Sequence, residues 1–210
     1  MGLTVHYHLR LPGTVTKMAA ENLVRTAHSR ATAFVRRNKL AGITPVLAAD
    51  PDAFLSRQFV AEERDGNTVA HEVPPECGWL FSVHPGRDCE SVLCGLAFYP
   101  ATIRVGRRTL RTGCGGWGYS GFCKTQYASL HGEAEFLKCH RAVIDLLLLW
   151  EKLGAKVKIT DEGGYWPGRN EATLRKNLAQ MNRLVAAFAG ALKDAADEGG
   201  VPEEESGLFA

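Results

Sequence analysis

The segment from Leu3 to Leu11 alternates between apolar and polar residues at every position. Successive side chains of a β-strand point to opposite faces, so the alternation predicts a strand with one buried face and one face in water. The buried face would carry Leu3, Val5, Tyr7, Leu9 and Leu11, and the wet face Thr4, His6, His8 and Arg10. We therefore expect a sheet whose apolar side chains are covered on one face only.

Three longer segments carry apolar residues at the three- and four-residue spacing of amphipathic helices. We expect a first helix from about Thr16 to Asn38, a second from about Glu133 to Leu153, and a third that begins after Asn170. The middle of the second helix is apolar on almost every side, which predicts that it lies in the core. The apolar stripe of the third helix consists of Leu174, Leu178, Met181, Val185, Phe188 and Leu192.

Shorter apolar runs predict further strands. Residues 79–83 and 91–99 predict a β-hairpin, and residues 156–161 alternate again, with Lys156 and Lys158 on the wet side. A short amphipathic strand is expected at 104–111, around a turn at Gly106. Residues 41–75 are less regular, with a short strand at 44–48, a turn at 50–52 and a loop around 62–66. The segment 112–127 holds five glycines within nine positions, and a loop is expected because glycine weakens helix and strand alike.

These elements predict an α+β fold, a two-layer sandwich in which helices cover one face of a sheet. The expected arrangement is a ferredoxin-like sheet with the C-terminal helix appended to it. Residues 1–197 would form a single α/β domain. Residues 198–210 hold four glutamates and no lysine or arginine, and they are expected to form an acidic disordered tail.

The composition favours a cytoplasmic protein that does not enter a membrane. No apolar run approaches the roughly 18 residues of a membrane-spanning helix, and the N-terminus lacks the basic and apolar regions of a secretory signal. The six cysteines form no C-x-x-C pair, which favours reduced thiols over disulfides or a structural zinc.

The net charge of the chain is +2, and without the four glutamates of the tail the body carries +6. Four arginines lie within 104–111, and five further basic residues lie along the first helix, between Arg25 and Lys39. A basic body favours anionic partners such as nucleic acid, nucleotides or phosphorylated small molecules. A solvated basic face without any ligand is the alternative.

Two phosphate-binding patterns are matched in part by the glycine-rich segment. Residues 113–118 match G-x-G-x-x-G, but neither a buried strand before them nor a helix after them is expected. Residues 118–125 depart from the Walker pattern, because Cys123 stands where its second glycine belongs. What remains is a glycine-rich segment beside Lys124, suited to hold an anion through backbone N–H groups.

His6 and His8 leave the same face of the predicted strand because they are two residues apart. They are suited to bind a metal with Asp161 or Glu162, or to contact a phosphate together with Arg10. Two exposed histidines without a ligand are the alternative.

A second glycine-rich segment, 161–168, follows a predicted strand and precedes a helix, a position where α/β proteins often bind anions. Its candidate ligand-binding residues, with the neighbouring arginine, are Asp161, Glu162, Tyr165, Trp166 and Arg169. A packed connection with both aromatic residues in the core is the alternative.

The sequence leaves three classes of function open. The first is a binding module for an anionic ligand at His6, His8, Arg10, Lys124 and the five residues of the 161–169 segment. The second is a protein-interaction or regulatory subunit, a homo-oligomer included. The third is an enzyme, either a metal-assisted hydrolase or a thiol enzyme with Cys123 as nucleophile and His131 or His140 as base. Neither a cofactor nor a reaction follows from the residues.

Overall fold

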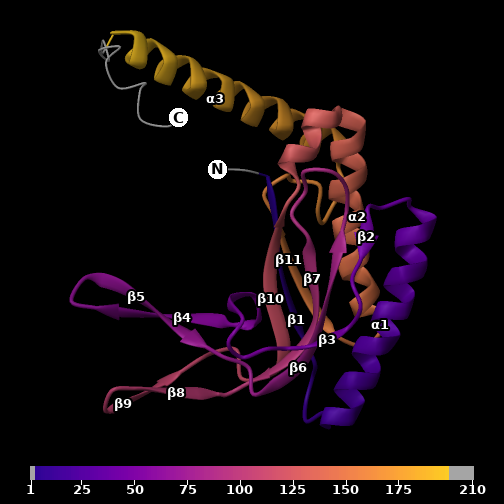
Figure 1. Cartoon of the computed structure of the whole chain (residues 1–210), viewed down its shortest axis with the longest axis vertical. Coiled ribbons are helices and arrows are strands. Elements are labelled where there is room, and N and C mark those ends of the chain that lie inside the picture. Colours follow the sequence, from indigo (N-terminus) through magenta and orange to yellow (C-terminus); the bar gives the residue numbers. More distant parts are fainter. Residues whose placement is uncertain (1–2, 199–210) are drawn as a thin grey trace, which may run out of the picture.

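The computed structural model describes residues 3–198, and its centre is an antiparallel sheet (Figure 1). The strands lie in the order β11-β1-β10-β7-β6-β2, and β3 pairs with the first half of β6. Their bounds are β1 Thr4–Arg10, β2 Gly42–Ile43, β3 Leu47–Ala48, β6 Cys77–His84, β7 Val92–Tyr99, β10 Gly116–Lys124 and β11 Lys156–Asp161.

Two helices, α1 (Lys17–Arg37) and α2 (Glu133–Glu151), cover one face of this sheet (Figure 1). The hydroxyl of Thr16 caps α1 by accepting a hydrogen bond from the N–H of Ala19 at 3.2 Å. Two 3₁₀ turns are η1 (Phe54–Ser56) and η2 (Gln126–His131). A third helix, α3 (Glu171–Glu198), begins beside α2 and then runs away from the body.

Within residues 3–198, none of the helices combines the length and the apolar character that a membrane crossing requires.

Two hairpins project together from the other side of the sheet (Figure 1). One consists of β4 (Gln58–Arg64) and β5 (Asn67–Val73), and the other of β8 (Thr102–Val105) and β9 (Arg108–Arg111). Glu62 joins them, because its carboxylate lies 2.6 Å from the Arg108 guanidinium and 2.9 Å from the His71 ring.

The core lies between the sheet and the helices α1 and α2. Phe81 of β6 is at its centre, with its ring stacked on Trp150 of α2 at 6.2 Å and edge-on to His28 of α1 at 5.0 Å between centroids. Strand β1 buries the face that its alternation predicts, namely Leu3, Val5, Tyr7, Leu9 and Leu11. Burying one large apolar side chain contributes roughly 1.5–3 kcal/mol, so the alternation decides which face of β1 meets the helices.

The prediction of a loop over the glycine-rich segment is wrong. Residues 116–124 form β10, which lies between β1 and β7 in the middle of the sheet. The glycines permit close packing here: a β-carbon at Gly118 would lie 2.6 Å from the carbonyl oxygen of Leu9, and one at Gly121 would lie 2.6 Å from the Tyr7 hydroxyl. Tertiary packing thus outweighs the weak intrinsic strand preference of glycine.

Other parts of the fold follow the sequence more closely. The mixed α+β class is confirmed, as are the helices near 17–37, 133–151 and from 171 on, the hairpin of β6 and β7, and the strand at 156–161. The loop expected around 62–66 is instead the end of β4 and a two-residue turn into β5. Of the expected acidic tail, residues 199–210 lie outside the described part of the chain.

The packing of β10 leads to a stability prediction. We expect Gly118→Ala to lower the free energy of unfolding by about 1–3 kcal/mol, because the new methyl group meets backbone that cannot move aside. Gly42→Ala in β2 is the control, since a β-carbon there meets nothing within 4 Å. Urea-induced unfolding measures both variants, and an equal effect of the two would contradict this explanation.

Candidate functional site

The face of β1 and β11 that points away from the helices carries a row of basic side chains. Both strands belong to one sheet, so the wet faces predicted for them are continuous. His8 lies opposite Lys158, and Arg10 lies opposite Lys156. We call this surface the basic strip and define it as His6, His8, Arg10, Lys156 and Lys158.

His8 is half-buried within the basic strip, next to two cations. Burial and the nearby charges of Arg10 and Lys158 lower the pKa of His8, so its imidazole is neutral at pH 7. The Nδ1 atom of His8 lies 2.5 Å from the Oγ atom of Ser120 on β10, which ties the basic strip to the next strand. An anion bound beside His8 would find two permanent cations, Arg10 and Lys158, and a histidine able to gain a proton.

A groove opens beside the basic strip, on the same face of the sheet. Strands β10 and β7 pair only between Gly116–Gly118 and Ala97–Tyr99, and beyond these residues β10 pairs with β1 alone. The Tyr7 hydroxyl donates to the carbonyl of Leu93 at 2.7 Å, and the Tyr119 hydroxyl donates to the carbonyl of Leu55 at 2.8 Å. The groove over this part of the sheet has a volume of about 620 Å³.

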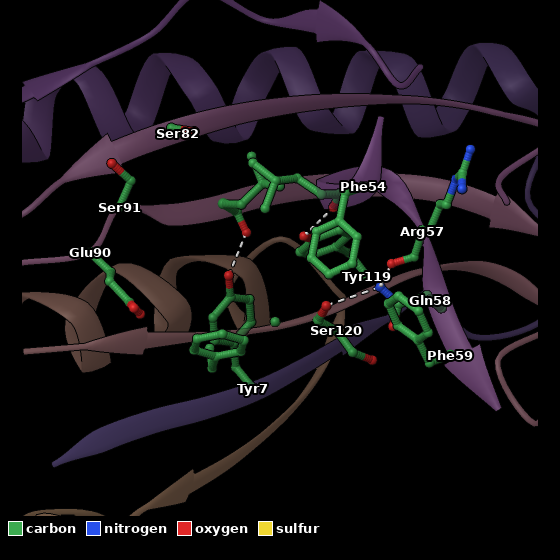
Figure 2. A pocket seen from close by; sticks show the side chains of 14 residues that line it. Tyr7, Phe54, Arg57, Gln58, Phe59, Ser82, Glu90, Ser91, Tyr119 and Ser120 are labelled. Atoms are coloured by element: carbon green, nitrogen blue, oxygen red, sulfur yellow. Dashed lines mark hydrogen bonds between the residues drawn. The ribbon is translucent and has the colours of Figure 1, made fainter. Parts of the chain in front are cut away.

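Aromatic and aliphatic side chains form most of the groove wall, with polar groups between them (Figure 2). Phe54 and Phe59 lie at one end, with ring centroids 5.6 Å apart, and Glu90 and Ser91 lie at the other end (Figure 2). The residues that line the groove are Tyr7, Phe54, Leu55, Arg57, Gln58, Phe59, Ser82, Glu90, Ser91, Leu93, Tyr119, Ser120, Gly121 and Phe122.

Strand β10 joins the groove to the basic strip. Phe122 lines the groove, is 52% exposed, and lies opposite His6 with ring centroids 6.1 Å apart. Ser120 also lines the groove and lies opposite His8. Lys124 adds a cation 5.7 Å from the centre of the Phe122 ring. The result is an apolar, partly aromatic surface that continues directly into a basic one.

Asp161 does not lie on this surface. Its carboxylate accepts hydrogen bonds from the N–H groups of Gly163, Tyr165 and Trp166 at 2.7–2.9 Å, and the Nε2 atom of His140 lies 3.0 Å from it. Burial acts to raise the pKa of Asp161, but His140 and these N–H groups outweigh it and hold the pKa below its usual value. This carboxylate organises the segment that leads into α3.

His140 extends the network of Asp161 to the end of β10. Its Nδ1 atom lies 2.8 Å from the hydroxyl of Thr125, and the side chains of both His140 and Asp161 are fully buried. Thr125 is itself 0% exposed. The row Thr125, His140 and Asp161 thus connects β10, α2 and β11 inside the protein, away from solvent.

The other candidate ligand-binding residues of the 161–169 segment do not lie together in the structure. Glu162 stays near the basic strip, with its carboxylate 3.4 Å from the Nε2 atom of His6. Tyr165 is buried edge-on to His140, which fits the alternative of a packed connection. Trp166 and Arg169 line a different hollow, between α1 and α2, where Arg169 donates to Asp145 at 2.8 Å. The 161–169 segment therefore does not form one site with the basic strip.

The enzyme alternatives find little support in the geometry. Within residues 3–198, no group of three or more histidine, cysteine or acidic side chains is arranged to hold a metal ion. Cys123 is fully buried, its thiol donates to the carbonyl of Glu90, and burial raises its pKa, whereas a nucleophilic cysteine needs a lowered one.

Sequence reasoning missed the aromatic part of the site. Phe54, Leu55 and Phe59 come from the irregular stretch before and within β4, and Tyr7 belongs to the buried face of β1. The one available signal was the pair Phe54–Leu55, two large apolar residues between polar neighbours. Their exposure, 68% and 67%, depends on a chain path that periodicity does not predict.

The Asp161 network leads to a prediction about acid stability. We expect Asp161→Ala to lower the free energy of unfolding by roughly 3 kcal/mol or more, because three buried N–H groups and His140 lose their partner. The folded-state pKa is below the unfolded one, so the contribution of the carboxylate is present above the unfolded pKa and is lost as the pH falls through the folded pKa. The wild-type protein should therefore lose stability below about pH 4, and the variant should lose less over that range.

Asp145→Ala is the matched control for this experiment. Asp145 also faces an arginine, but its side chain is 40% exposed, so its loss should cost less than about 1 kcal/mol. Chemical unfolding at several pH values measures both variants, and equal losses would show that Asp161 is not a structural carboxylate.

Comparison of this chain with protein-family models, with curated proteins and with solved structures gives no match. Its function is inferred from the geometry of the groove and the basic strip.

Proposed function

We propose that this protein binds an anionic ligand that contains a planar ring, namely a nucleotide unit, either free or within a single-stranded nucleic acid. The ring would lie in the groove and the phosphate on the basic strip. One observation carries the proposal: Phe122 and Ser120 of β10 line the aromatic groove and at the same time lie opposite His6 and His8 of the basic strip.

The groove offers what a nucleobase requires. Phe54 and Phe122 present rings that are more than half exposed, and stacking of a base on an aromatic side chain contributes about 1–3 kcal/mol. Glu90, Ser91 and Ser82 supply hydrogen-bonding groups along the groove wall. A mostly apolar pocket with a few polar groups is the usual form of a small-molecule site.

The basic strip offers what a phosphate requires. Lys156, Lys158 and Arg10 are exposed, and in the part of the chain that the structure describes no ion pair neutralises them. Adjacent strands lie about 4.8 Å apart, so Lys158 is two strands and roughly 10 Å from Ser120 at the groove. Long lysine and arginine side chains can shorten that distance towards a ligand in the groove.

Two further expectations belong to the same proposal. The connectivity β1-α1-β7-β10-α2-β11, with the spatial order β11-β1-β10-β7, supports a ferredoxin-like unit to which the remaining strands are added.

The six free cysteines support a cytoplasmic location. A protein-interaction role is the alternative, and it would use the same exposed aromatic residues.

The proposal predicts that ring and phosphate contacts can be removed separately. We expect Phe122→Ala to weaken binding of a fluorescein-labelled oligothymidylate and of ATP by about 5- to 100-fold, through the loss of stacking. Lys158→Ala should also weaken binding of both ligands. For the oligonucleotide, it should reduce the slope of log affinity against log salt concentration by about one, the value of a single lost phosphate contact. Fluorescence anisotropy and calorimetry measure these affinities.

Arg30→Ala is the control, because Arg30 is an exposed cation on α1, on the other side of the sheet. It should leave both affinities within about twofold. Tight binding of the oligonucleotide alone would assign the site to single strands, and tight binding of ATP to free nucleotides. No binding of either below about 1 mM at low salt would reject the proposal in favour of a protein partner.

The lowered pKa of His8 adds a pH prediction. A phosphodiester beside His8 favours its protonated form, so the pKa rises on binding and affinity should increase as the pH falls from 8 to 6. Because a phosphodiester does not titrate in this range, the oligonucleotide is the suitable probe. The His8→Gln variant should show a smaller dependence of affinity on pH, whereas the His6→Gln variant should retain the part that is due to His8. If the affinity of His8→Gln changed with pH as much as that of the wild type, contact between His8 and the anion would be contradicted.

A further inference from the structure

Helix α3 exposes a row of large apolar side chains where it leaves the body. Leu174 and Leu178 are buried against the rest of the protein, but farther along Leu184, Val185 and Phe188 are 49%, 52% and 67% exposed. Figure 1 shows the helix extending past α2, and none of the other elements within residues 3–198 lies beside its outer part. An isolated apolar side chain on a surface is ordinary, whereas a continuous row along a projecting helix indicates a contact surface.

The spacing of the apolar residues in α3 is the spacing by which one helix packs against another. Leu174, Leu178, Met181, Val185 and Phe188 follow one another at intervals of four, three, four and three residues, and Leu192 continues the series in the sequence. An average repeat of 3.5 residues is the pattern by which two helices pack side by side over several turns. The first two positions are used inside the molecule. Met181 is partly buried and packs against the same core, so we call the exposed positions that follow it in the series, Val185 and Phe188, the outer seam.

We propose that the outer seam pairs with the outer seam of a second copy of this chain, so that two α3 helices form an antiparallel pair. This inference is independent of the proposed ligand site, which lies on the open face of the sheet.

The residue sizes in α3 favour a second copy over an unrelated helix. The segment 184–192 holds no charged residue, and around the large Phe188 it has alanine at 186, 187, 189 and 191 and glycine at 190. Large side chains on one helix need small ones opposite them to pack without voids. Two copies of this segment related by a two-fold axis supply both, because each carries a large residue within a small-residue surface.

The charge distribution of α3 favours the antiparallel orientation. In the sequence, the first half of the helix has three basic residues and one acidic residue, Glu171, and the second half has three acidic residues and one basic residue, Lys193. Antiparallel pairing brings the basic half of one helix towards the acidic end of the other. It also places the two bodies at opposite ends of the pair, since each helix leaves its body at its N-terminal end.

The length of the outer part is sufficient for such a pair. About 20 residues follow Leu178 within α3, which corresponds to roughly 30 Å of helix. A helix of this length without tertiary contacts is marginally stable in water, whereas burial of an apolar stripe against a partner stabilises it.

Sedimentation equilibrium of the full chain at 1–200 µM tests the proposal. We expect the wild-type protein to reach a mass of twice 22.9 kDa within this range. Phe188→Glu and Val185→Glu should each weaken association at least tenfold, because a charge would enter the centre of the pair. Leu130→Glu is the control: Leu130 is 75% exposed on η2, outside α3, and the variant should associate like the wild type.

Circular dichroism of the same samples tests whether the variants fold. We expect them to fold because the side chains of Val185 and Phe188 are exposed. A wild-type chain that stays monomeric at 200 µM would overturn the proposal. So would a dimer that Phe188→Glu leaves unchanged or that Leu130→Glu weakens equally, because the interface would then lie elsewhere.

Discussion

Strand β10 lies so close to β1 that the backbone leaves no room for a side chain at Gly118, and Gly121 leaves the space that the Tyr7 hydroxyl occupies. Much of the molecule depends on this approach. It makes β10 the central strand and lets Tyr7 reach the carbonyl of Leu93 on β7. It also directs Ser120 and Phe122 to the open face, where the groove and the basic strip meet. A glycine-rich segment here serves strand packing and not a phosphate loop.

The buried row of Thr125, His140 and Asp161 connects the end of the tightly packed strand β10 to α2 and to the edge strand β11. Thr125 directly follows β10, His140 belongs to α2, and Asp161 ends β11. A charged side chain inside a protein is tolerated when its partners satisfy it, and Asp161 has three N–H groups and an imidazole within 3.0 Å. The edge strand β11, which carries two of the three lysines and arginines of the basic strip, is thereby linked to α2 and to the end of β10.

The open face combines an aromatic groove with a basic strip. The groove keeps large aromatic side chains in partial contact with water, which does not stabilise the fold. The basic strip places cations next to one another, and burial together with the charges of Arg10 and Lys158 lowers the pKa of His8. Both arrangements act against stability, whereas the interior network is satisfied, and for this reason we propose that the ligand binds on this face.

The sequence alone determined the elements whose periodicity is strong: the strands at 4–10 and 156–161, the hairpin of β6 and β7, the three long helices and the mixed α+β class. It also placed His6, His8 and Arg10 on the wet face of one strand and Lys156 and Lys158 on the wet face of another, because strand alternation is a local property, whereas the pairing of these two strands in one sheet came from the tertiary structure. Only the tertiary structure decided that the glycine-rich segment is a central strand, that Asp161 is buried while Glu162 is not, and that Phe54 and Phe122 line one groove. These features depend on contacts between residues far apart in the chain, and side-chain periodicity along one segment carries no information about them.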